Sequence, residues 1–283
     1  MNIDAKHLQS WIGKRESTCQ ILAPEPVIRL AALLDYAEPP WADGNIADLG
    51  HWLYFLPQVR ASEMGEDGHP KLGGFLPPVP LPRRMWAGSN IEFHQLPLIG
   101  EVVERESTVV SVTHKSGKSG ELVFVGIEHR LSSERGILLR ERQDIVYREA
   151  STVVIESVAP VADELPMLDW RREVHPDPVM LMRFSALTFN AHRIHYDRDY
   201  AREQEGYAGL VVHGPLTATL LMDLFRRNNP QGRITAFSFR GLRPLLDTAP
   251  LTLAGRELPG GAQLWALDHH GQIAMSATLE VQG

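Results

Sequence analysis

The stretch FSALTFNAHRIHYD, residues 184–197, is the part of the sequence richest in side chains that can do chemistry. It holds an amide and two imidazoles within six positions: Asn190, His192 and His195. A second stretch, LVVHGPLTATLL at 210–221, opens a long apolar run with His-Gly-Pro. Imidazoles move protons near neutral pH, and the free N–H groups at a helix start stabilise developing negative charge. The two stretches together predict a site where a proton moves while a neighbouring oxygen gains charge.

The elements that must position these residues are helices on either side of them. Helical spacing of apolar residues predicts helices over 24–37, 178–188 and 214–228, and a short polar helix over 198–205. The Gly-Pro start and the basic end of 214–228 suit the helix dipole. The imidazole-rich stretch therefore lies between two helices, with its partner stretch at the N-terminus of the longest one.

Two runs of alternating residues predict antiparallel strands. The first run fills 86–149, and the second comprises 233–243, 250–257, 262–268 and 272–281. IEFHQLPLIGE at 91–101 loosely resembles FSFRGLRPLLD at 237–247. The class is therefore predicted as α+β, with two copies of a helix followed by a curved antiparallel sheet.

Two segments interrupt this pattern. Residues 39–82 are rich in Pro and Gly and predict a long irregular segment, which is either a functional lid or a packed excursion. Residues 150–177 carry several prolines and are interpreted as a linker.

Composition narrows the class of protein. The 283 residues carry a formal net charge of −7, which argues against general nucleic-acid binding. The single cysteine excludes an intramolecular disulfide and a Cys-rich metal site. The sequence has no His-x-x-x-His pattern with a carboxylate partner and no Gly-rich phosphate loop, so we predict neither a metal site nor a nucleotide site. We find no secretory signal and no apolar run long enough to span a membrane, and we expect a cytoplasmic protein without membrane or nucleic-acid partners.

The two chemistry-bearing stretches resemble the motifs of MaoC-like (R)-specific enoyl-CoA hydratases, which have the hot-dog fold. His195 takes the position of that family's catalytic His, and Val212-His213-Gly214 matches its helix start. Asn190 stands where the family has its catalytic Asp, and His192-Arg193 where it has Asn-Pro. The variant NAHRIHYD, with MWAGSNIEFH at 85–94, is similar to a subfamily of double hot dogs. That subfamily includes itaconyl-CoA and mesaconyl-C4-CoA hydratases and two-domain hydroxyacyl-thioester dehydratases.

The resemblance implies a double hot dog, with a degenerate half over 1–150 and a catalytic half over 151–283. It implies reversible addition of water to an α,β-unsaturated acyl-CoA. CoA is then part of the substrate, and no redox or metal cofactor is needed. Because hot-dog sheets often pair, a homodimer is expected by analogy.

The resemblance also assigns roles. His195 would deprotonate water, and the Gly214 N–H would hold the enolate oxygen. Asn190 cannot titrate and would position water or the thioester. A second titratable group must then come from elsewhere, or one group must serve both steps. His192 is the nearest candidate, and a side chain facing away is the equal alternative. We interpret His213 as orienting the loop and Asp197 as a helix N-cap.

Binding residues are predicted on the same basis. Arg193 and Arg240 would bind a free carboxylate of the acyl group. The candidates for the CoA phosphates, with a solvated surface position as the alternative, are Arg183, Arg226, Arg227 and Arg243. Trp86 and Phe93 would wall the acyl pocket, unless they are ordinary core residues.

The favoured substrate is a C5 branched dicarboxylic acyl-CoA, itaconyl-CoA or mesaconyl-C4-CoA. The runner-up is a 3-hydroxyacyl-thioester dehydratase acting on fatty acyl chains. Two alternatives of other classes are a hot-dog thioesterase and a non-catalytic acyl-CoA binding protein.

Overall fold

A computed structural model describes residues 3–41, 44–117, 120–150 and 163–282. Within these residues ten strands form one sheet in the order β1-β3-β4-β5-β2-β7-β10-β9-β8-β6, and all neighbouring strands are antiparallel. The first five strands are β1 Arg15–Ile21, β2 Arg83–Phe93, β3 Val102–Gly117, β4 Gly120–Ser133 and β5 Gly136–Arg148. The last five are β6 Trp170–Val174, β7 Arg233–Gly241, β8 Leu251–Leu258, β9 Gly261–Leu267 and β10 Ile273–Gln282.

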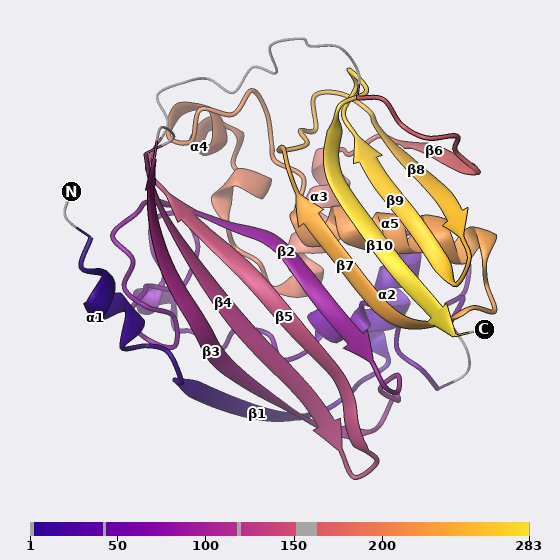
Figure 1. The fold of residues 1–283 in the computed structure, drawn as a ribbon, viewed down its shortest axis with the longest axis horizontal. Coiled ribbons are helices and arrows are strands. Elements are labelled where there is room, and N and C mark those ends of the chain that lie inside the picture. The colour runs from indigo at the N-terminus through magenta and orange to yellow at the C-terminus, as the bar shows by residue number, and fades with distance from the viewer. Residues whose placement is uncertain (1–2, 42–43, 118–119, 151–162, 283) are drawn as a thin grey trace.

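The sheet consists of two halves that repeat the same strand order. Strands β1 to β5 and β6 to β10 occupy equivalent places, and β2 pairs with β7 at the junction. Ile91 lies directly opposite Phe237 there, and these are the first residues of the two stretches whose likeness suggested a repeat. The curved, continuous sheet confirms the predicted double hot-dog architecture (Figure 1).

The helices lie on one face of this sheet. Figure 1 shows α2, α3 and α5 behind the second half of the sheet and its junction with the first. The described helices are α1 Ala5–Gln9, α2 Glu25–Leu33, α3 Pro178–Thr188, α4 Arg198–Glu203 and α5 Gly214–Asn228, with 3-10 turns η1 Gly50–Leu53, η2 Ala61–Glu63 and η3 Arg193–His195. Every residue of α5 from Leu216 to Phe225 is buried, so its apolar surface forms the core of the second half. No helix among the described residues is long and apolar enough to cross a membrane.

Edge strands are where the sequence-based assignment was wrong. The predicted linker 150–177 contains β6, which pairs with β8 at one edge of the sheet. At the opposite edge, β1 was missed, because most of its residues are exposed and polar and show no apolar alternation. Residues 151–162 lie outside the described part of the chain, so the predicted domain boundary at 150 stays a prediction.

The described residues of segment 39–82 are packed against the core rather than detached from it. Tyr54 is 2% exposed, and its hydroxyl donates to the Ala23 carbonyl at 2.6 Å. Trp52 donates its indole N–H to the buried Glu141 carboxylate at 3.1 Å. His51 and Ser89 also bond that carboxylate, at 3.0 and 2.7 Å. These contacts tie the segment to β2 and β5.

Candidate active site

His195 lies at the end of η3 and is buried in the site. Its Nδ1 lies 2.7 Å from the Val211 carbonyl oxygen, which can only accept a hydrogen bond, so Nδ1 carries the proton. The lone pair of Nε2 is then available to accept a proton. Burial lowers the pKa of His195 to about 4, against the raising effect of the Val211 bond. The ring is therefore neutral at pH 7 and can act as a base.

The ring of His213 packs against that of His195. The two rings stack with centroids 3.6 Å apart and an interplanar angle of 19°. His213 is fully buried, and its Nε2 lies 2.8 Å from the Ser185 hydroxyl of α3. Burial, followed by repulsion from His195 and His192, lowers its pKa well below the ordinary value. His213 thus fixes the ring of His195, which fits its predicted orienting role.

The N-terminus of α5 offers backbone donors beside these rings. His213 is the N-cap residue and makes no side-chain capping bond. Proline at 215 has no N–H, and the first backbone bond of the helix runs from Thr217 to His213 at 3.0 Å. The N–H of Gly214 therefore has no intrahelical partner and lies at the N-terminus of α5, the positive end of the helix dipole. A Cβ on Gly214 would lie 3.7 Å from the Trp86 carbonyl oxygen, which places this donor next to β2.

Asn190 shapes the turn between α3 and η3. Phe189 ends α3 in the left-handed conformation, with φ of 49°. The Asn190 N–H then donates to the Ser185 carbonyl at 2.8 Å, and its side-chain Oδ1 accepts the His192 N–H at 3.0 Å. The side-chain NH₂ and the second lone pair of Oδ1 are left to contact a ligand, and a role for Asn190 in holding water or thioester stays a prediction.

His192 faces the site, and two residues of segment 39–82 meet it there. Its ring centroid lies 5.4 Å from that of His195 and 4.0 Å from that of His69. His69 Nδ1 lies 2.9 Å from Asp67 Oδ2. The alternative in which His192 faces away is therefore wrong. Ligand atoms of Asp67, His69 and His192 all lie within 4.8 Å of one another, so the structure assembles a set that a divalent ion could use, where the sequence predicted no metal site.

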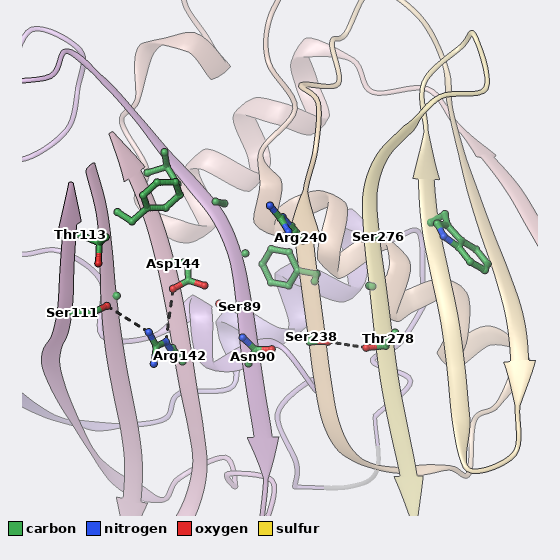
Figure 2. A pocket seen from close by; sticks show the side chains of 18 of the residues that line it. Ser89, Asn90, Ser111, Thr113, Arg142, Asp144, Ser238, Arg240, Ser276 and Thr278 are labelled. Atoms are coloured by element: carbon green, nitrogen blue, oxygen red, sulfur yellow. Dashed lines mark hydrogen bonds and ion pairs between the residues drawn. The ribbon is translucent and has the colours of Figure 1, made fainter. Parts of the chain in front are cut away.

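The two arginines predicted to bind the substrate carboxylate are placed elsewhere. Arg193 donates to Asp197 at 3.0 and 2.8 Å and to the Glu66 carbonyl at 3.2 Å, so its guanidinium is already engaged. Arg240 lies on β7 and lines a groove of about 600 Å³ on the face of the sheet opposite the helices (Figure 2). Phe239 next to it packs inward against Trp86, and alternation along the strand turns Arg240 outward.

The remaining predicted residues divide between site, core and surface. Trp86 lies edge-on to Trp52 at a centroid distance of 5.0 Å, with its backbone carbonyl next to Gly214, and its role as a wall of the acyl pocket stays a prediction. Phe93 is 6% exposed and is a core residue. Asp197 is confirmed as an N-cap, accepting the Tyr200 N–H at 3.0 Å. Three of the four arginines predicted to bind the CoA phosphates form ion pairs with carboxylates of this chain: Arg226 with Asp48, Arg227 with Asp223 and Arg243 with Asp163. The fourth, Arg183, is exposed on α3.

Four further residues were missed by sequence reasoning: Asp67, His69, Trp52 and Arg84. Arg84 lies opposite Tyr147 in the β2–β5 ladder, so the two side chains share a face. Burial is the main cause that lowers the pKa of both His69 and His192, and the positive charge of Arg84 lowers both further. Within the described residues Arg84 makes no hydrogen bond or ion pair. The only available signal was the string GEDGHP within a segment already singled out as irregular.

Comparisons with known proteins agree with this architecture. Residues 47–247 match the family model described as hydroxyacyl-thioester dehydratase type 2. The chain is 46% identical over 277 residues to a mesaconyl-C(4)-CoA hydratase of Chloroflexus aurantiacus, covering 97% of this chain and 98% of that one. It is 26% identical to the mitochondrial hydroxyacyl-thioester dehydratase type 2 of Schizosaccharomyces pombe, over 87% and 86%. The crystal structure of a MaoC-like dehydratase from Phytophthora capsici shares the fold at a TM-score of 0.71 and 10% identity, over 99% and 98%. The chain belongs to the hydroxyacyl-thioester dehydratase type 2 family.

Proposed function

We propose that this protein adds water reversibly to the C=C bond of a C5 dicarboxylic acyl-CoA, such as mesaconyl-C4-CoA or itaconyl-CoA. Family membership and the 46% identical hydratase make the chain a hydro-lyase-type enzyme acting on acyl thioesters. The chemistry is supported by the Nε2 of His195 and the Gly214 N–H at the start of α5, neither of which has a hydrogen-bond partner among the described residues. The C5 substrate is supported by the name of the relative from Chloroflexus aurantiacus.

The geometry supports the following course of hydration. His195 Nε2 takes a proton from water as the water oxygen bonds to Cβ. The π electrons of the Cα=Cβ bond move toward the thioester, whose oxygen becomes an enolate. The Gly214 N–H and the helix dipole stabilise that oxygen. The site then returns this proton to Cα, which leaves His195 neutral again, and the thioester carbonyl reforms, so that one water is added and nothing is oxidised or reduced.

Arg84 replaces Arg193 and Arg240 as the proposed partner of the free carboxylate. It lies two residues before Trp86 on β2, on the same face as the buried ring of Tyr147. The Tyr147 hydroxyl has no hydrogen-bond partner among the described residues. Neither the guanidinium of Arg84 nor this hydroxyl has a hydrogen-bond partner in the described part of the chain, and Arg84 acts electrostatically on His69 and His192, so the pair suits a carboxylate acceptor.

Mass spectrometry of the wild-type protein tests the reaction. Incubation with mesaconyl-C4-CoA, itaconyl-CoA and crotonyl-CoA is expected to add one water to the C5 substrates. His195→Ala should abolish the gain, and His175→Ala, an exposed histidine paired with Glu173, is the matched control. Hydration of crotonyl-CoA alone would favour the fatty-acyl dehydratase. Release of free CoA thiol would point to a thioesterase, and binding without any product to a non-catalytic role.

The specificity is tested separately with Arg84→Gln. We expect KM for the C5 dicarboxylic substrate to rise at least tenfold while crotonyl-CoA is unaffected, because only the former carries a second carboxylate. Arg240→Ala, on the opposite face of the sheet, is the matched control. Equal losses on both substrates in Arg84→Gln would contradict a carboxylate subsite.

Three sequence-based expectations stay proposals. A homodimer is tested by light scattering in solution. The cytoplasmic location is tested by fractionation of the source cells. Independence from cofactors is tested by turnover after dialysis against a chelator.

A further inference from the structure

The site lacks a carboxylate at position 190, yet hydration both removes a proton from water and adds one to Cα. We propose that His69, held by Asp67, is the second proton-transfer group of this site and that His192 links it to His195. The proposal rests on the hydratase function proposed above. It assigns an active role to the Pro/Gly-rich segment of the first half, which the family motif does not include.

The loop carrying Asp67 and His69 is fixed against the catalytic loop by its backbone. The Arg193 N–H donates to the Asp67 carbonyl at 2.9 Å. Gly68 has φ of +87°, and a Cβ there would lie 1.8 Å from the Ala191 carbonyl oxygen. The loop is also closed on itself, because the Gly65 N–H donates to the His69 carbonyl at 2.7 Å. Only glycine permits this approach, which brings the His69 ring onto that of His192.

Hydrogen bonds fix which nitrogen of His69 can react. Asp67 accepts from His69 twice, from the ring Nδ1 and from the backbone N–H, both at 2.9 Å. Nε2 is therefore the nitrogen left to take or give a proton. Burial raises the pKa of Asp67, but the bonds and charge of His69 outweigh it and leave the pKa at about 2. The carboxylate is ionised at pH 7 and stabilises an imidazolium formed on His69.

The charged and titratable groups around His69 favour a neutral resting ring. Burial is the main cause that lowers its pKa, Asp67 raises it, and Arg84 on β2 lowers it. On the catalytic loop, burial and repulsion from His69 and His195 lower the pKa of His192 to about 2. The three rings of His195, His192 and His69 are therefore neutral at rest. Of the three, His69 best accommodates a proton, because its ring is bonded to the Asp67 carboxylate.

The proposed step balances in protons and electrons. His195 Nε2 takes a proton from water as the C–O bond forms at Cβ. A proton passes through the imidazole of His192 to His69 Nε2, where Asp67 balances the charge. His69 then delivers a proton to Cα of the enolate, and all three rings are neutral again. The reverse sequence eliminates water.

Kinetics of His69→Gln and Asp67→Asn test the proposal, on the full chain with the C5 enoyl-CoA. We expect kcat to fall about 10²- to 10⁴-fold in His69→Gln with KM within about twofold, the range of general acid–base catalysis. Asp67→Asn should lower kcat less. It should also move the acid limb of the pH–rate profile to lower pH, because loss of the carboxylate lowers the pKa of His69. Glu66→Gln, an exposed neighbour on the same loop, should match the wild type.

Several results would overturn the proposal. One is an unchanged kcat in His69→Gln, and another is a pH limb in Asp67→Asn that does not move. If His69→Gln melts below the assay temperature, the pH limb of Asp67→Asn decides. One equivalent of metal in the wild type that is lost in His69→Gln, with a chelated wild type that is inactive, would replace proton transfer by metal binding. A wild type that hydrates no enoyl-CoA would instead refute the hydratase function itself, and with it this proposal.

Discussion

Substitution of Gly68 by alanine is the sharpest perturbation of the contact between the two loops. The added Cβ would lie 1.8 Å from the Ala191 carbonyl oxygen, whereas real Cβ atoms essentially never come within 3.0 Å of a neighbour. The two loops must therefore separate by more than 1 Å. A displacement of about 1 Å at a catalytic group can cost roughly 100-fold in rate. The positive φ adds about 1–2 kcal/mol of backbone strain.

Gly73→Ala separates the two effects. Gly73 lies in the same segment with φ of +98°, but its Cβ would meet only Pro78 at 3.8 Å, which is ordinary contact. Both variants carry the strain of a positive φ, and Gly68→Ala should lose more stability in urea unfolding because its two loops must also separate. Only Gly68→Ala should also lose about 100-fold in kcat on the enoyl-CoA substrate. Wild-type kcat in a folded Gly68→Ala protein would refute our reasoning that the loop at 65–69 belongs to the active site.

Two further predictions concern stability. Burial lowers the pKa of His129 and of His195 to about 4. Below pH 6.5 the unfolded chain therefore binds more protons than the native one. The stabilisation from keeping each histidine neutral is present at pH 7, and the free energy of unfolding falls by roughly 2 kcal/mol per histidine when the pH is lowered to 5. Urea midpoints that are equal at pH 7 and pH 5 would contradict this. Arg226→Met removes the guanidinium that binds the buried carboxylate of Asp48, which is 4% exposed. Because that charge is left without its partner, the free energy of unfolding should drop by about 3–5 kcal/mol. The exposed Arg183→Met should change it by less than about 0.5 kcal/mol, and similar urea curves for the two variants would count against the buried pair.

Local signals allowed parts of the fold to be predicted from the sequence. The bounds of α3 and α5 agree with the predicted 178–188 and 214–228, because Pro near the helix start and apolar spacing act within a few residues. Strand β6 was missed for the opposite reason: it is short, partly exposed and lies at the edge of the sheet. Its assignment depends on pairing with β8, about 80 residues away in the chain, and no local pattern encodes that pairing.

The same distinction separates the site residues. His195 and Gly214 could be found because a motif holds them at short, fixed spacing around one turn and one helix start. Arg193 was misassigned because type and position suggested a carboxylate ligand, whereas Asp197, four residues on, already binds it. His69 and Arg84 could not be identified, because their closeness to His192 exists only after the first half folds against the second.

The sequence by itself determined the turn that carries His195, the helix that begins beside it and the alternation of the inner strands. These depend on hydrogen bonds and apolar periodicity between residues close in the chain. The tertiary structure decided which groups complete the site. Packing across the β2–β7 junction places Trp86 near α5, and a glycine with positive φ lets the loop at 65–69 reach the catalytic turn. Those contacts join residues more than 100 positions apart, and their cost in chain entropy is met by burial of the whole sheet and its helices rather than by any local preference.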